Sequence, residues 1–123
     1  MRFMTIVRSK EGGFGPPPPA LFQAIGELGM EAAQKGIKVE QGGLMHSSTG
    51  ATVRLSPDGV LTVKDGPFSE AKEVFGGFAI YTLGSKADAI EWAKKFLELH
   101  KKHWKGWEGE VEIRQMMEFG PPA

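Results

Sequence analysis

The chain has no cysteine among its 123 residues. Disulfide bonds, thiol catalysis and zinc sites built on cysteine are therefore excluded. A net charge is lacking as well, because 15 basic side chains balance 15 acidic ones. Without an overall electrostatic field, we expect neither a nucleic acid nor an anionic membrane as a partner.

Long apolar runs are also missing. None approaches the roughly 20 residues that a membrane-spanning helix requires. The N-terminus, MRFMTIVRSKEGG, has two arginines around a short apolar run and no small-residue cleavage site. It therefore predicts a strand and not a signal peptide, and by default we expect a cytoplasmic protein. No glycine-rich phosphate loop with an adjoining Lys-Ser or Lys-Thr occurs either, and we expect no cofactor.

What the chain does contain is typical of a globular protein. Hydrophobic residues make up 41% of the sequence and charged residues 24%, close to the averages for soluble proteins. The length suits one domain over residues 1–123, with a single core.

Apolar periodicity and turn signals divide the chain into six strands and two helices. The strands are expected at 3–7, 38–45, 52–55, 60–63, 74–83 and 111–117, and the helices at 21–35 and from 85 to about 100. A run of four prolines before the first helix predicts a stiff, extended connector. Gly36 is the expected cap at the end of that helix, and Ser85 is the expected N-cap of the second. The pair Gly42 and Gly43 suggests a bulge in the strand at 38–45.

This order of elements predicts an α+β protein with a ferredoxin-like antiparallel sheet, two helices on one face and an added β-hairpin. The strands around Phe3 and Phe78 are apolar on both faces, yet two helices cover only one face of such a sheet. The second face needs a cover that the chain does not supply. A second copy is the simplest candidate, and we expect a homodimer with its two sheets packed face to face.

Several segments together carry a family resemblance. They are the N-terminal strand MRFMTIV, a GGL segment after the first helix, the motif VKDGPFSEAKE, the strand GGFAIY and the helix ADAIEWAKKF. In this combination the chain resembles the YCII-related family, in the branch named for its DGPF motif, over nearly its whole length. The resemblance implies a dimeric α+β barrel of ferredoxin-like subunits, with a biochemical function that is largely undefined.

The resemblance also implies two kinds of function. Many members of the broader family pair a histidine on the first helix with an aspartate near its end, and a dehydrochlorinase is among the relatives, which indicates enzymes. Some DGPF members are linked to sigma-factor domains, which indicates regulation. The helix expected at 21–35 contains neither histidine nor aspartate, so that dyad does not carry over to this chain.

Asp65, the first residue of the DGPF motif, is the leading candidate for chemistry. Burial at the end of a buried strand would raise its pKa, which suits a general acid or base near neutral pH. The alternative is structural, because aspartate opens turns by accepting backbone N–H groups, with Gly66 and Pro67 shaping the turn. The two roles are compatible.

His46 follows the strand expected at 38–45, near the place where the hairpin and the motif loop meet. Within reach of Asp65, it would form a His-Asp pair for proton transfer. Otherwise it is an ordinary polar residue of its loop.

Three further residues are candidates for contacts with a small molecule. Lys72, in the motif loop, suits an anionic group of a ligand, or else forms weak surface ion pairs. Tyr81, the only tyrosine, lies on the strand after the motif. It lines a pocket at the sheet interface together with Phe68 or Phe78, or else it fills the core.

The segment HKKHWKGW, residues 100–107, mixes basic and aromatic side chains, a composition that some nucleic-acid-binding proteins use. In a neutral chain we favour tryptophans that dock on the core or on the dimer partner. His100 and His103 supply only two ligands, too few for a zinc site, and we expect no metal.

The leading hypothesis is a dimer that binds a small organic molecule in a pocket near the DGPF loop, with acid-base chemistry at Asp65 as one option. The alternative is a non-enzymatic accessory or regulatory module that is linked to transcription through protein contacts. An exposed apolar patch around Trp104 and Trp107 would favour the alternative.

Overall fold

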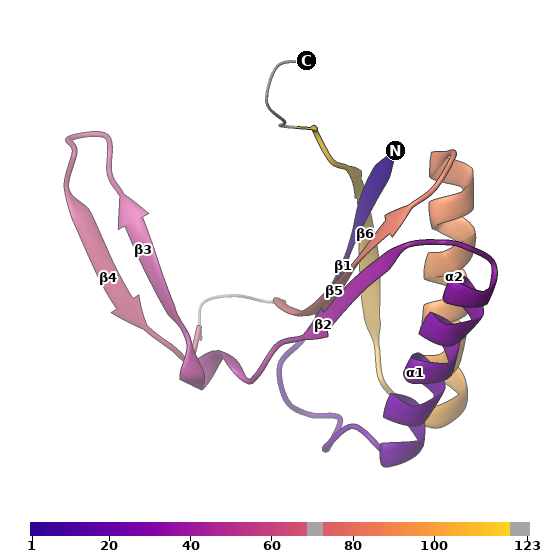
Figure 1. Ribbon diagram of the computed structural model, residues 1–123. Coiled ribbons are helices and arrows are strands. Elements are labelled where there is room, and N and C mark those ends of the chain that lie inside the picture. The colour runs from indigo at the N-terminus through magenta and orange to yellow at the C-terminus, as the bar shows by residue number, and fades with distance from the viewer. Residues whose placement is uncertain (69–72, 119–123) are drawn as a thin grey trace.

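The computed structural model describes residues 1–68 and 73–118 (Figure 1). Its elements, in chain order, are β1 (Arg2–Ser9), α1 (Pro19–Gln34), β2 (Val39–Gly43), the 3-10 turn η1 (Ser47–Thr49), β3 (Ala51–Leu55), β4 (Leu61–Asp65), β5 (Val74–Thr82), α2 (Lys86–His103) and β6 (Gly109–Gln115). Each predicted strand and helix is present, with ends shifted by a few residues.

Four strands form one antiparallel sheet in the order β2-β5-β1-β6. The first and third strands of the ferredoxin-like plan, β1 and β5, are therefore its central pair. Both helices lie on one side of this sheet, and the hairpin of β3 and β4 stands on the other side (Figure 1). The architecture is α+β and compatible with the ferredoxin-like fold predicted from the order of elements.

Helix α1 begins inside the proline run, at Pro19, because proline lacks only a backbone donor that the first helical turn does not use. Its buried residues are Leu21, Ala24, Leu28 and Ala32. It ends before Gly36, whose φ of 75° is the left-handed conformation that glycine adopts without strain. The C-terminal end confirms the sequence prediction, whereas the start is two residues earlier than expected, within the proline run.

Helix α2 begins where Ser85 was expected to cap it, since the Ser85 hydroxyl accepts a hydrogen bond from the Asp88 backbone N–H at 3.2 Å. It continues to His103, three residues past the expected end. Its Trp92 stacks on Tyr81 of β5, with ring centroids 5.8 Å apart, at the centre of the core. Neither described helix is long and apolar enough to cross a membrane.

The predicted bulge at Gly42 and Gly43 is wrong, because β2 pairs with β5 without a register shift. The shift falls between β1 and β5 instead, where Val7 opposes Gly77 and Arg8 opposes Phe75. Gly76 is the extra residue. An added Cβ at Gly77 would lie 2.9 Å from the Gly42 carbonyl oxygen, so glycine is needed there for the close approach of two strands.

The hairpin of β3 and β4 is confirmed, with its turn at Ser56–Gly59 closed by a 2.9 Å hydrogen bond from the Gly59 N–H to the Ser56 carbonyl. Every strand residue of the hairpin is exposed. The expectation that Asp65 ends a buried strand is therefore wrong for the single chain. The alternation of polar and apolar residues makes one face of this ribbon apolar, and no other element in residues 1–68 and 73–118 covers it.

Candidate functional site

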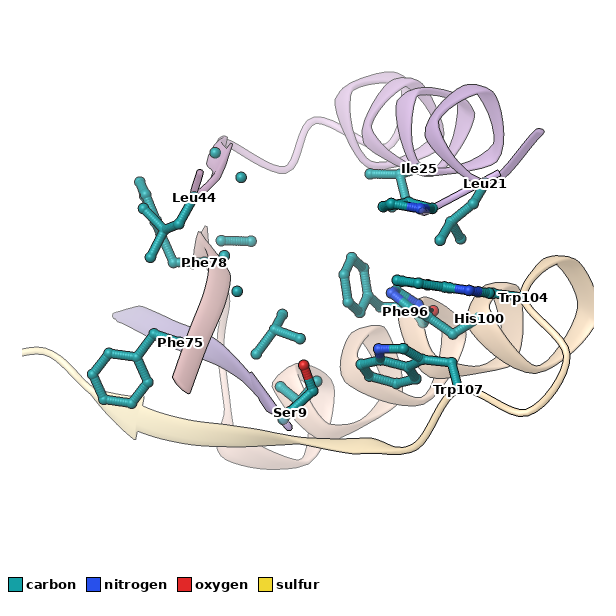
Figure 2. Close-up of a pocket in the computed structure, with 18 of the residues that line it drawn as sticks. Ser9, Leu21, Ile25, Leu44, Phe75, Phe78, Phe96, His100, Trp104 and Trp107 are labelled. Carbon is teal, nitrogen blue, oxygen red and sulfur yellow. Dashed lines mark hydrogen bonds between the residues drawn. The ribbon is translucent and has the colours of Figure 1, made fainter. Parts of the chain in front are cut away.

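A cavity of about 560 Å³ lies between the helix side of the sheet, the two helices and the segment of residues 10–18, which we call the strap. Its volume falls within the range of small-molecule pockets, and its walls are mainly apolar, as in most such pockets. Figure 2 shows Ile25 and Leu21 of α1 on one side of this hollow, with Trp107 on another. The sequence predicted a pocket near the DGPF loop, and this cavity lies on the helix side of the sheet.

Aromatic rings of α2 and the segment after it form one wall of the cavity (Figure 2). The His100 ring lies 4.6 Å from the Phe96 ring and 4.4 Å from the Trp107 ring, measured between centroids. Trp104 stacks beside Trp107 at 6.0 Å. The two tryptophans thus dock on the core, as expected, and do not form a separate exposed patch.

Tyr81 brings an unpaired polar atom to the cavity. The residue is 4% exposed, and its hydroxyl has no hydrogen-bond partner among the residues that the structure describes. Burial raises the pKa of this phenol, so the hydroxyl stays protonated and available as donor and acceptor. Among the described residues the fully buried side-chain polar atom without a partner is Arg8 Nε, so the Tyr81 hydroxyl keeps access to solvent and is a candidate ligand contact.

His100 is a second candidate for a polar contact with a ligand. Its Nδ1 lies 3.0 Å from the Phe96 carbonyl oxygen, which accepts a hydrogen bond and so assigns the proton to Nδ1. The ring's Nε2 is then an acceptor, without a partner in the described part of the chain. Burial lowers the pKa of His100, and the ring is therefore neutral at neutral pH.

Hydrogen bonds hold the strap in place over the cavity at two of its residues, Glu11 and Phe14. At one end, the Ser47 backbone N–H donates a 2.7 Å hydrogen bond to the Glu11 carboxylate, and the Ser47 hydroxyl donates a second. These two hydrogen bonds, hydroxyl first, lower the pKa of Glu11. At the other end, the Trp104 indole N–H donates to the Phe14 carbonyl at 3.0 Å.

The DGPF motif lies behind Ser47. The Phe68 backbone N–H donates to the Ser47 hydroxyl oxygen at 3.2 Å, and the Gly66 N–H donates to the Gly50 carbonyl at 2.9 Å. An added Cβ at Gly66 would lie 1.8 Å from the Ser47 carbonyl oxygen. Only glycine allows this contact, so the motif supports Ser47, which in turn anchors the strap through Glu11.

The two residues predicted to act as a catalytic pair make different contacts. His46 lines the cavity, but its ring nitrogens contact Ser48 and Glu11: Nδ1 accepts from the Ser48 N–H at 3.1 Å, and Nε2 lies 3.5 Å from a Glu11 oxygen. Asp65 is exposed at the end of β4 and is absent from the cavity wall in residues 1–68 and 73–118.

The three predicted ligand contacts also have different places. Tyr81 lines the cavity. Phe68 is half-buried against Gly50, behind the wall and not in it. Lys72 lies outside the described residues.

Sequence reasoning missed Glu11, Ser47 and His100 as site residues. For His100 a signal existed, because Trp92, Phe96 and His100 recur every four residues and so share one face of α2. Nothing in the sequence pattern connects Glu11 with Ser47, which are 36 residues apart.

A family model, the YCII-related domain, matches residues 1–119. The chain belongs to the YCII-related family. No curated protein matches it. Membership agrees with the antiparallel sheet carrying two helices on one face, and it assigns no ligand or reaction to the cavity of this YCII-related chain.

Replacing Ser47 with Ala removes one hydrogen bond to the Glu11 carboxylate and one from Phe68. We expect the free energy of unfolding to fall by about 2 kcal/mol, because one lost bond involves a charged group. Urea titration followed by tryptophan fluorescence measures this. Ser48→Ala is the control at the neighbouring exposed position and should change stability by less than about 0.5 kcal/mol. Equal losses in the two variants would contradict the role given to Ser47.

His100 should make stability depend on pH. Unfolded histidine has a pKa near 6.5, and in the folded chain burial lowers it. The unfolded state therefore binds the proton first, and stability falls as the pH drops below about 6.5 toward the folded pKa. In His100→Phe this pH-dependent loss of stability should disappear. The variant also loses the hydrogen bond to the Phe96 carbonyl, but that loss lowers stability equally at every pH. Urea midpoints at several pH values test it, and an unchanged slope in the variant would refute the assignment.

Proposed function

We propose that this chain binds a small, uncharged organic molecule with a ring system in the cavity under the strap. One observation carries the proposal: a largely apolar cavity of about 560 Å³ contains two unpaired polar atoms, the Tyr81 hydroxyl and the His100 Nε2. Apolar walls supply binding free energy through buried area. A few placed polar groups then set the orientation of the ligand.

The charges around the cavity favour a neutral ligand. Burial keeps the His100 ring neutral, and the Glu11 carboxylate already accepts hydrogen bonds from Ser47. A charged ligand would lose its hydration among aromatic walls, and that loss is costly, because the charged lining residues Lys10 and Glu11 belong to the strap and not to the aromatic wall. A hydroxyl or amide on a flat ring matches the donor and acceptor that Tyr81 and His100 offer.

Acid-base chemistry at Asp65 and His46 stays a prediction and is not part of this proposal. The His46 Nδ1 accepts from the Ser48 N–H, and its Nε2 lies 3.5 Å from a Glu11 oxygen, so both ring nitrogens already have contacts. Asp65 does not reach the cavity wall in the described part of the chain. We place the chain in the DGPF branch of its family on the motif at Asp65–Phe68, whose contacts to Ser47 support a structural role.

We also propose that two copies pair through the open face of the sheet. Met4, Ile6, Phe78 and Ile80 lie on that face, opposite the helices, and are half-exposed in the single chain. One row across this face runs from Glu40 on β2 through Ile80 and Met4 to Arg114 on β6. A two-fold axis parallel to the strands would set Glu40 of each copy opposite Arg114 of the other, a complementary arrangement.

The regulatory alternative has less support at the place where it was expected. Trp104 and Trp107 line the cavity and stack on each other, so they offer no separate patch for a transcription partner. Five of the exposed large apolar side chains of the described chain lie on the β3–β4 hairpin, and others, such as Phe22 and Phe75, are on separate elements.

Binding of 2-naphthol, compared with naphthalene, tests the proposed ligand class. Both are flat and uncharged, and only 2-naphthol has a hydroxyl for Tyr81 or His100. We expect saturable binding of 2-naphthol, followed by tryptophan fluorescence and calorimetry. Tyr81→Phe should weaken it about fivefold, the value of one hydrogen bond near 1 kcal/mol, while naphthalene binding stays unchanged.

Asp65→Asn is the matched control and should bind 2-naphthol as the natural chain does. Absence of saturable binding of either probe would contradict the ligand proposal. Equal weakening by Tyr81→Phe and Asp65→Asn would instead return Asp65 to the site.

A further inference from the structure

The β3–β4 hairpin has one apolar face that nothing in the described chain covers. Val53 pairs with Val63, and Leu55 pairs with Leu61, so the four side chains lie on the same face. Each of the four is exposed by 66% or 67%. The opposite face is polar, with Thr52 beside Lys64 and Arg54 beside Thr62.

A two-stranded ribbon of this kind is at best marginally stable in water on its own. At its base the ladder is extended by the hydrogen bond from the Gly66 N–H to the Gly50 carbonyl, and the Phe68 N–H then bonds to the Ser47 hydroxyl oxygen. A cluster of four exposed apolar side chains on one face of an otherwise polar ribbon is typical of a contact surface. The apolar face therefore requires an occupant from outside the described chain.

The position of the hairpin indicates which occupant. The hairpin stands on the side of the sheet away from the helices (Figure 1), which is the side of the open face with Met4, Ile6, Phe78 and Ile80. A partner that packs on the open face would therefore meet the hairpin as well. We propose that the hairpin packs its apolar face against the body of a second copy of this chain, as an arm exchanged between the two subunits.

The dimensions agree with an exchanged arm. A strand of five residues extends about 17 Å, compared with a spacing of about 10 Å between two packed sheets, so the hairpin is long enough to contact the partner's body. The open face of the four-stranded sheet has a footprint of about 500 Å², below the roughly 800 Å² per partner of a standard interface. Each face of the hairpin adds about 160 Å², which brings the contact closer to that size.

This inference rests on the proposed homodimer, and the test separates the two. The double substitution Val53→Thr with Val63→Thr keeps the side-chain shape and the strand preference while making the apolar face polar. We expect the dimer dissociation constant, from sedimentation over a concentration series, to rise at least tenfold. Arg54→Thr, on the polar face of the same ribbon, is the matched control and should change it less than twofold.

The lack of cysteine allows a second measurement. In Leu61→Cys carrying an environment-sensitive dye, emission should shift to the blue as the protein is concentrated into dimers. A natural chain that stays monomeric at every concentration would overturn both the dimer and the arm. Two results would contradict the exchanged arm while leaving the dimer in place. One is an unchanged dissociation constant in the double variant, and the other is dye emission that does not shift to the blue when the dimer forms.

Discussion

One side chain, Ser47, connects the strap over the cavity with the DGPF motif. Its hydroxyl donates to Glu11 of the strap and accepts from the Phe68 N–H of the DGPF motif. Three segments far apart in the sequence thus meet at a residue that is only 7% exposed. Because the Ser47 carbonyl leaves no space for a Cβ at Gly66, the motif and the 3-10 turn fit together only with glycine at that position.

The sheet divides the molecule into two surfaces with different tasks. On the helix side, Tyr81 and His100 offer polar atoms inside an apolar cavity. On the other side, the open face and the hairpin expose apolar side chains to solvent in the single chain. We therefore assign the helix side to a small ligand and the other side to a second copy. The family match is compatible with this division but specifies neither partner.

The sequence predicted the elements well because local signals define them. Pro19 and Gly36 set the ends of α1, and the Ser85 cap set the start of α2. The site was less accessible, because its contacts join residues that no local pattern connects, such as Glu11 and Ser47. The short, alternating strand ending at Asp65 was interpreted as buried, although Thr62 and Lys64 already gave it a polar face typical of an exposed ribbon.

The position of the β-bulge was also beyond what the sequence could predict. Two glycine pairs occur in strands, and glycine marks both bulges and close backbone contacts. Register alone distinguishes them: Gly76 is the extra residue of β5, whereas Gly42 receives the close approach of Gly77. Register is a property of paired strands, so one strand's sequence does not determine it.

The central claim is that a neutral ring-containing ligand binds under the strap. The most direct measurement is the set of intermolecular nuclear Overhauser effects between bound 2-naphthol and the protein. We predict contacts from the probe to the ring protons of Tyr81, Phe96 and Trp107. Contacts confined to Val53 and Leu61 of the hairpin would contradict it, because the probe would then bind the exposed apolar ribbon and not the cavity.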